Sequence, residues 1–251
     1  MIIDHPKTGD VPGLKRLWQQ AFGDPMPFID GFFETGFAPE RCRCLHQDGQ
    51  LAAALYWFDC AYAGQTLAYV YAVATDTAFR RQGLCHALME DTLHHLKSQG
   101  YGAAVLVPAG DPLRQFYQGM GFQNFGGIGE FICTQGAVPA DIRPVTAEEY
   151  AASRQQLLPK TGVLQEGATL AFLNTYTQFY AGENILFALF RDTDGAFVPE
   201  LLGDAAKAPG ILNALNLPQG RFRVPGGEPF AMYYPLEKDF KVPGYFGLAL
   251  D

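Results

Sequence analysis

The sequence "TDTAFRRQGLCHALMEDTL", residues 75–93, contains the feature that decides the fold. An apolar run leads into two arginines and a glycine, and the chain then takes up the spacing of an amphipathic helix. A helix begins with about four backbone N–H groups that lack an intrahelical acceptor, and its dipole adds about half a positive charge there. Arg80 and Arg81 add charge, and Gly83 keeps side chains away from the backbone. This junction is predicted to bind a phosphate or a pyrophosphate. An ordinary strand–loop–helix connection with surface arginines is the alternative interpretation.

The helix that starts near Gly83 is expected to pack one face and to expose the other. Leu84 and Leu88 share one stripe at helical spacing, and further apolar residues lie beside it. The polar residues of the same helix point elsewhere, and three histidines are expected on its solvent-exposed surface: His86, His94 and His95.

Strands and helices alternate on both sides of this junction. Two helices are expected over residues 9–24 and 25–37, followed by a strand, an Asp-Gly turn and a strand over 41–60 and an extended run at 67–74. A short buried strand at 103–109, a helix at 111–122 with Asp111 as its N-cap and a strand at 122–133 come after it. The predicted fold is α/β with a mixed sheet.

The composition fits a globular protein that has one large domain or two of ordinary size. Of the 251 residues, 48% are hydrophobic and 18% are charged. The five cysteines are an odd number and lack a second cluster at zinc-ligand spacing, so we expect thiols, no disulfide framework and no metal. No apolar stretch is long enough to cross a membrane and no secretory signal is seen, so a cytoplasmic location is expected.

The charge distribution argues against nucleic-acid binding. The formal net charge is −8, and residues 1–135 and 136–251 each contribute −4. Neither half offers the basic stripe that a phosphate backbone requires.

Two motifs resemble those of the GNAT N-acetyltransferases. The stretch "RRQGLC" after an apolar strand is similar to that family's R/Q-x-x-G-x-G/A motif, which binds the pyrophosphate of acetyl-CoA. Cys85 departs from the family's glycine or alanine. The resemblance implies that acetyl-CoA is the cosubstrate and that this loop supplies six cofactor-binding residues: Arg80, Arg81, Gln82, Gly83, Leu84 and Cys85.

The second motif is "LRQFYQGMGF", residues 113–122, which is similar to the family's A-x-x-x-Y-x-x-x-G-F. It places Tyr117 at the position of the tyrosine that protonates the leaving CoA thiolate, although a core aromatic beside Phe116 is the alternative interpretation. The 34 residues from Gly83 to Tyr117 leave room for the helix, turn, strand and half helix that the family order requires. Gly110 replaces a frequent asparagine, so one pantetheine contact is missing or supplied otherwise.

The resemblance covers about residues 1–135 and implies a GNAT domain with a mostly antiparallel sheet flanked by helices. It implies direct attack by a primary amine on the acetyl group in a ternary complex. Main-chain groups of Val73, Ala74 and Thr75 would bind pantetheine and polarise the acetyl carbonyl. Phe32, Tyr69 and Tyr71 are the candidate substrate contacts, with core packing as the alternative for Phe32.

The general base is not identified by the sequence. Tyr69 and Tyr71 share a strand face with Val73 and could hold a water molecule. Glu34, Asp59 and His46 are the other candidates, and a structural or solvated role is the alternative for each.

The second half, residues 136–251, is interpreted as a degenerate GNAT-like domain. It mixes strands and helices, with helices expected at 146–158, 167–180 and 208–216, but it has no glycine-arginine junction. It resembles the later domains of aminoglycoside acetyltransferases of the "enhanced intracellular survival" type, in which the C-terminal carboxylate reaches the active site. That role is not carried over to Asp251, because this chain is shorter than those proteins. The alternative function is a catalytically inactive acyl-CoA-binding or interaction module, and the expected oligomeric state is a monomer or a homodimer.

Overall fold

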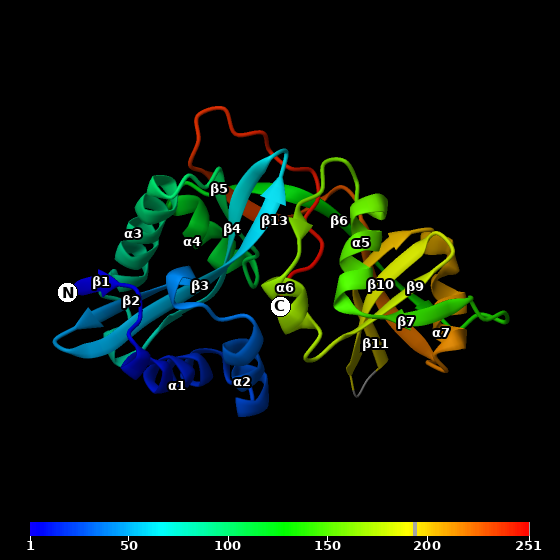
Figure 1. Ribbon diagram of the computed structural model, residues 1–251, viewed down its shortest axis with the longest axis horizontal. Coiled ribbons are helices and arrows are strands. Elements are labelled where there is room, and N and C mark those ends of the chain that lie inside the picture. The colour runs from blue at the N-terminus through cyan, green and yellow to red at the C-terminus, as the bar shows by residue number, and fades with distance from the viewer. Residues whose placement is uncertain (193–194, 251) are drawn as a thin grey trace. The chain divides into compact units, whose positions relative to one another are not determined.

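The computed structural model describes residues 1–192 and 195–250 (Figure 1). Asp251 lies outside the described residues. The chain divides into two compact units. The first is Met1–Gln123 with Tyr233–Lys241, and the second is Asn124–Met232 with the residues from Val242 onward. The predicted division into domains at residue 135 stays a prediction, and a late segment of the chain belongs to the first unit.

The first unit contains a mixed, mostly antiparallel sheet, as the sequence predicts. Its strand order is β1-β2-β3-β4-β5-β13. The neighbouring strands from β1 to β4 pair antiparallel, whereas β4 and β5 are parallel. The strands of this sheet are β1 (Ile2–Asp4), β2 (Cys42–Gln47), β3 (Gln50–Tyr62), β4 (Gln65–Thr75), β5 (Ala103–Leu106) and the end of β13 (Glu228–Pro235).

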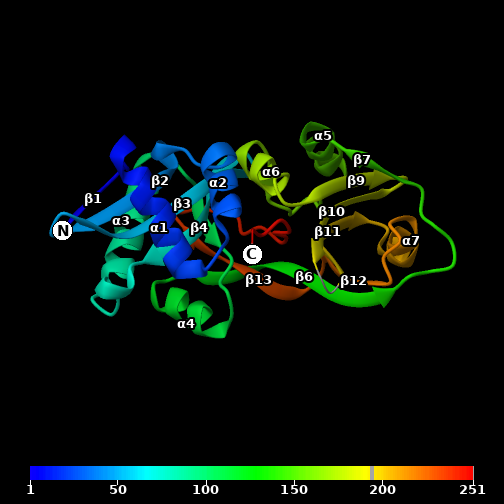
Figure 2. The same cartoon turned by 90° about the horizontal axis from the view of Figure 1, so that it is seen from below.

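Helices cover both faces of this sheet. Figures 1 and 2 show α1 (Val11–Phe22) and α3 (Leu84–Ser98) on opposite sides of β2 and β3. The residues of β3 from 52 to 58 are therefore buried without alternation. On the α1 side, Trp18 packs its ring 5.4 Å from that of Tyr56. The unit also contains α2 (Met26–Thr35) and α4 (Asp111–Gly119).

The predicted apolar stripe of α3 is confirmed. Its buried residues are Leu84, Leu88, Met89, Thr92, Leu93 and Leu96. The prediction that His95 is solvent-exposed is wrong, because its ring is partly buried and meets the ring of His5 edge-on at 4.9 Å between centroids.

Residues 233–241 complete the first unit. The Leu236 amide donates to the Gly102 carbonyl over 2.9 Å, and the Tyr233 hydroxyl donates to Gln123 over 2.9 Å. The ring of Tyr234 lies 5.5 Å from that of Phe122, three residues after the end of α4. A segment more than 100 residues later in the sequence thus packs on the end of the first unit's last helix.

The second unit repeats the order of the first. Along the chain, a strand is followed by two helices, which the short β8 (Leu164–Gln165) separates. Three antiparallel strands, a helix and a parallel strand come next. The strand β6, which precedes all of these, pairs antiparallel with β12. The elements are β6 (Gln123–Thr134), β7 (Ile142–Val145), α5 (Ala147–Leu157), α6 (Ala168–Leu173), β9 (Gln178–Gly182), β10 (Ile185–Asp192), β11 (Gly195–Gly203), α7 (Ala208–Ala214) and β12 (Gln219–Pro225).

The helix predicted over residues 167–180 is wrong in its second half. It ends at Leu173, and β9 begins at Gln178. Adjacent β9 residues face opposite sides of the sheet: Phe179 stacks on Tyr150 of α5 at 4.3 Å, and Tyr180 stacks on Phe187 at 5.1 Å. Packing on both faces therefore overrides the apparent helical spacing of this segment.

A buried ion pair organises the second unit's interior. Arg154 and Glu200 have 0% exposed side chains and are joined through two nitrogens of the guanidinium group, at 2.7 and 2.9 Å. The hydroxyls of Tyr150 and Tyr245 also donate to the Glu200 carboxylate, at 2.9 and 3.0 Å. Since both charges are fully hydrogen-bonded, the pair is tolerated in the core and fixes the segment around Tyr245.

Candidate functional site

A tight loop connects β4 to α3 in the first unit. A single turn of 3-10 helix, η3 (Thr77–Phe79), follows β4 and is capped by Asp76, whose carboxylate accepts from the Ala78 amide at 2.9 Å. Four residues, 80–83, then lead into α3. Two of them, Arg81 at φ 62° and Gly83 at φ 77°, have left-handed backbones. Such alternation turns successive N–H groups toward one side, which forms a concave site for an anion.

The N-terminus of α3 carries no internal substitute for an anion. Gly83 is its N-cap and offers no side-chain hydrogen bond, and the first turn holds no acidic residue. A Cβ placed on Gly83 would meet no atom within 4 Å. The glycine is therefore required by its backbone angle, and the space in front of the helix amides is open. These features fit a diphosphate.

The polar side chains of the loop are exposed, and those of Arg80 and Gln82 make hydrogen bonds to neighbouring residues. The Arg80 Nε donates to the Thr75 carbonyl at 3.1 Å, which ties the loop to the end of β4. Gln82 donates to the Ala78 carbonyl at 3.4 Å and accepts from Gln47 at 3.3 Å. The exposed guanidinium groups of Arg80 and Arg81 extend the positive charge of the helix terminus.

The end of β4 separates from β5, as the sequence-based interpretation requires. The register with β5 runs from Leu67 to Tyr69, whereas β4 continues to Thr75. Ala72 has a φ of 49°, and the register with β3 shifts at this point, so β4 is bulged there. Ala74 and Thr75 still pair with β3, which leaves their other edge turned toward the β5 side. Main-chain groups at Val73–Thr75 are thus positioned along one open edge.

Tyr117 lies near the C-terminal end of α4 and is 7% exposed. Its ring is edge-on to Phe116 at 5.3 Å and to Phe122 at 5.6 Å. Burial raises the pKa of the Tyr117 hydroxyl well above its ordinary value, and the Cys85 thiol adds to the effect. Tyr117 is therefore within electrostatic range of the first turn of α3 and keeps its proton at neutral pH.

The loop cysteine is also protonated. Burial raises the pKa of Cys85 to about 11, so its thiol is a poor nucleophile at neutral pH.

The N-cap predicted for α4 is wrong by one residue, because Gly110 occupies that position and Asp111 is the first helical residue. Gly110, with a φ of 89°, supplies the turn into the helix.

The candidate substrate residues are mostly internal. Phe32 and Tyr69 are 1% and 2% exposed, and Phe32 packs 4.7 Å from Trp18 between ring centroids. Tyr71 is partly buried on the same side, 6.1 Å from Phe32. Phe32 thus fits the core-packing alternative, whereas Tyr71 retains some exposed surface beside the bulge in β4.

The candidate bases are dispersed. Asp59 pairs in register with Ala68, at the far end of β4 from Val73. At about 3.3 Å per residue this separation is roughly 16 Å along the strand, too far for direct proton transfer. His46 is 3.3 Å from the Asp10 carboxylate, and Glu34 is an exposed residue of α2.

In the described part of the chain, no three His, Cys, Asp or Glu side chains gather as metal ligands would. No helix among the described residues is long and apolar enough to cross a membrane.

The family model of the acetyltransferase (GNAT) domain matches residues 3–125. These residues form a GNAT acetyltransferase domain. The protein is therefore an acyltransferase, and the GNAT fold implies transfer of an acyl group from an acyl-CoA to an acceptor. The predicted resemblance to the GNAT family is confirmed. No curated protein matches the sequence.

Solved GNAT structures share the fold across both units. The GCN5-related N-acetyltransferase from Anabaena variabilis has a TM-score of 0.72 at 16% identity, over 94% of this chain and 73% of that one. Eis1 from Mycobacterium abscessus has a TM-score of 0.67 at 12% identity, with the same coverage. A tandem GNAT protein from the clavulanic acid biosynthesis pathway has a TM-score of 0.56 at 13% identity, over 95% of this chain and 99% of that one. At these identities the similarity establishes the fold.

Proposed function

We propose that the protein is an N-acetyltransferase that transfers the acetyl group of acetyl-CoA to a primary amine by direct attack in a ternary complex. The observation that carries the proposal is the buried, protonated Tyr117 near the first turn of α3. A leaving thiolate needs a proton donor, and the Tyr117 hydroxyl would be that donor if the pantetheine arm, which separates the sulfur of CoA from its diphosphate, leads the sulfur to α4.

The loop and the strand edge would bind different parts of acetyl-CoA. The amides that follow Gly83 and the side chains of Arg80, Arg81 and Gln82 would hold the diphosphate. Leu84 anchors the first turn in the core, and Cys85 follows it. The open edge at Val73, Ala74 and Thr75 would pair with the pantetheine arm.

The chemistry would then follow from these positions. Acetyl-CoA supplies an acetyl group as a thioester, whose carbonyl would accept a main-chain hydrogen bond from the β4 edge. The nitrogen lone pair of a neutral amine would form the new C–N bond as the C–S bond breaks, and the proton that this nitrogen then loses would pass to water, from which the Tyr117 oxygen regains the proton that it gives to the sulfur. The hydroxyl of Tyr117 would donate its proton to the departing sulfur. Tyr71 would border the acceptor side, and Phe32 and Tyr69 would support it from within the core.

Replacing Tyr117 by phenylalanine tests the proposal. The substitution removes the acid but keeps the buried ring, so we expect turnover of acetyl-CoA with a panel of amines to fall by about 10²- to 10⁴-fold. CoA affinity measured by calorimetry should change by no more than about threefold, because the loop is untouched. Tyr62→Phe is the matched control, since Tyr62 lies at the hairpin end of β3.

Equal rates for wild type and Tyr117→Phe would remove Tyr117 from the mechanism. Tight CoA binding with no turnover of any amine by the wild type would favour the inactive acyl-CoA-binding module instead.

The second unit is proposed to be a GNAT-like domain that lacks the cofactor loop. After β11, Asp204 caps the 3-10 turn η4 (Ala205–Lys207) by accepting from the Ala206 amide at 3.0 Å, as Asp76 does in the first unit. The helix α7 then begins at once with Ala208, whereas four residues separate η3 from α3. Those four residues are the arginine–glycine loop, and the described residues between η4 and α7 offer no counterpart of it, which supports this proposal.

A further inference from the structure

An aromatic surface of the first unit lies beside the end of β4. Its centre is Trp18 on α1, which is 2% exposed. The rings of Phe22, Phe28 and Tyr71 lie 6.0, 6.5 and 5.5 Å from the Trp18 ring between centroids. These three residues keep accessible surface, and Phe22, the last residue of α1, is 48% exposed. We call Phe22, Phe28 and Tyr71 the aromatic rim.

Two observations place the aromatic rim next to the proposed site of acyl transfer. Tyr71 precedes Val73 by two residues, which corresponds to about 7 Å along the strand. The Gln20 side chain donates to the Thr77 hydroxyl over 2.8 Å and so holds the end of α1 against η3, which follows β4. An acceptor whose amine lies at the open edge of β4 would therefore have the rest of its structure within reach of the aromatic rim.

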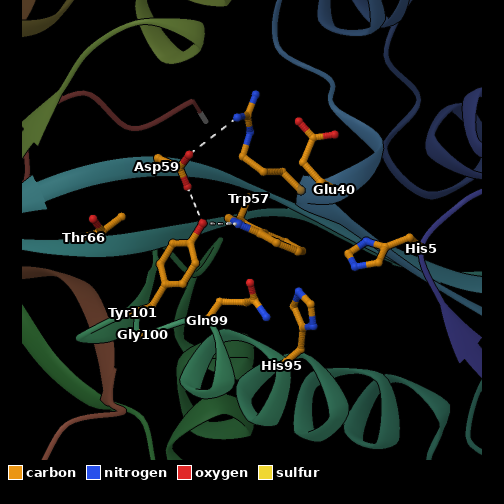
Figure 3. Close-up of a pocket in the computed structure, with 10 residues that line it drawn as sticks. His5, Glu40, Trp57, Asp59, Thr66, His95, Gln99, Gly100 and Tyr101 are labelled. Atoms are coloured by element: carbon orange, nitrogen blue, oxygen red, sulfur yellow. Dashed lines mark hydrogen bonds and ion pairs between the residues drawn. The ribbon is translucent and has the colours of Figure 1, made fainter.

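A cavity elsewhere in the first unit is too far from that edge to hold the acceptor. Its volume is about 410 Å³, and it lies between β3 and the end of α3, as Figure 3 shows. The residues that line it include His5, Asp59, Thr66, His95 and Tyr101. Thr66 precedes Val73 by seven residues, roughly 23 Å along β4. Asp59 is also engaged within the protein, because Tyr101 donates to one of its oxygens at 2.6 Å and Arg41 to the other at 3.5 Å.

The charges around the aromatic rim do not match an acceptor with several positive charges. The Asp24 carboxylate accepts from the Trp18 indole N–H over 2.7 Å, and Asp30 pairs with Lys15 over 2.6 Å. Glu34 is the other acidic residue of α2, and α1 has none. A polycation needs several carboxylates that are not already paired, whereas aromatic rings bind an aryl or branched alkyl group. The aromatic rim therefore favours a monoamine with an apolar group.

We infer that the acceptor is a monoamine with an aromatic or branched apolar group, and that Phe22 is a specificity-determining residue for it. The apolar group lies against the aromatic rim while the amine nitrogen lies at the edge of β4. Removing the apolar surfaces of both from water lowers the free energy of the bound state. The inference rests on the function proposed above, because it takes the edge of β4 as the place of acyl transfer.

Three primary amines test the inference on the full chain with saturating acetyl-CoA: 2-phenylethylamine, ethanolamine and spermidine. We expect kcat/KM for 2-phenylethylamine to exceed kcat/KM for each of the other two at least about tenfold. Equal values, or a preference for ethanolamine or spermidine, would overturn the inference and leave the proposed acetyl transfer intact. If no amine of any class reacts, the proposed function and this inference fall together.

Variants of Phe22 locate the contact. Phe22→Ala should lower the ratio of kcat/KM for 2-phenylethylamine to that for ethanolamine at least about fivefold, because it removes the exposed ring. Phe22→Leu keeps an apolar side chain and should keep this ratio within about threefold of the wild-type ratio. Ile132→Ala is the control, since Ile132 is a 72% exposed apolar residue of the second unit, and it should leave the ratio unchanged. An unchanged ratio in Phe22→Ala, including an equal loss of activity with both amines, would overturn the assignment of Phe22.

Discussion

At the residue scale, glycine at position 83 meets two separate requirements. One is the left-handed backbone angle, and the other is the open space that a bound ligand would need. Its φ of 77° disfavours any L-residue, and the surrounding space is open. Alanine should therefore cost about 1 kcal/mol of strain and lower the melting temperature by about 3 °C. If the diphosphate lies against this backbone, the added methyl group should also lower CoA affinity at least tenfold, measured by calorimetry.

Gly64 provides the matched control for this substitution. It has a φ of 81°, and a Cβ there would also meet no atom within 4 Å, but it lies in the turn between β3 and β4. Gly64→Ala should show the same thermal shift with unchanged CoA binding. A parallel loss of CoA affinity in both variants would mean that strain, not the ligand, explains the effect.

At the element scale, the loop of residues 80–83 separates η3 from α3, whereas α7 follows η4 directly in the described part of the second unit. Its two arginines are exposed and carry the charge that complements a diphosphate. Charge-assisted hydrogen bonds contribute about 1.5–3 kcal/mol each. Arg80→Glu with Arg81→Glu should therefore weaken CoA binding more than 100-fold in calorimetry.

The control for this reversal changes the net charge equally but elsewhere. Arg16 on α1 and Lys238 are exposed residues of the same unit, and reversing both should leave CoA affinity within about threefold at physiological salt. Similar losses in the two double variants would show that CoA responds to net charge alone.

Local elements of the first unit could be predicted from the sequence, because their signals are local. The glycine–arginine junction, the apolar stripe of α3 and the hairpin strands are encoded within short windows. The strand β9 could not be predicted, because its residues pack on both faces of a sheet assembled from distant segments. The cavity beside His95 could not be predicted either, since His5, Trp57 and Tyr101 are far apart in the sequence.

At the scale of the whole molecule, residues 233–241 make the first unit depend on the end of the chain. A fragment of residues 1–135 would lose the hydrogen bonds from Leu236 and Tyr233 and the packing of Tyr234 on Phe122. Buried side chains contribute about 1.5–3 kcal/mol each and hydrogen bonds about 1 kcal/mol. The loss therefore approaches the 5–15 kcal/mol that holds a typical domain together.

We therefore expect the 1–135 fragment to lack a cooperative thermal transition in circular dichroism and calorimetry. A synthetic peptide of residues 228–241 should restore the transition, because it returns the β13 strand and the segment that contacts Gly102 and Phe122. A scrambled peptide of the same composition should not. If the fragment alone melts cooperatively at the temperature of the full chain, residues 1–135 form a domain that is stable by itself. The late segment then only packs on its surface, and the folding unit ends at residue 135.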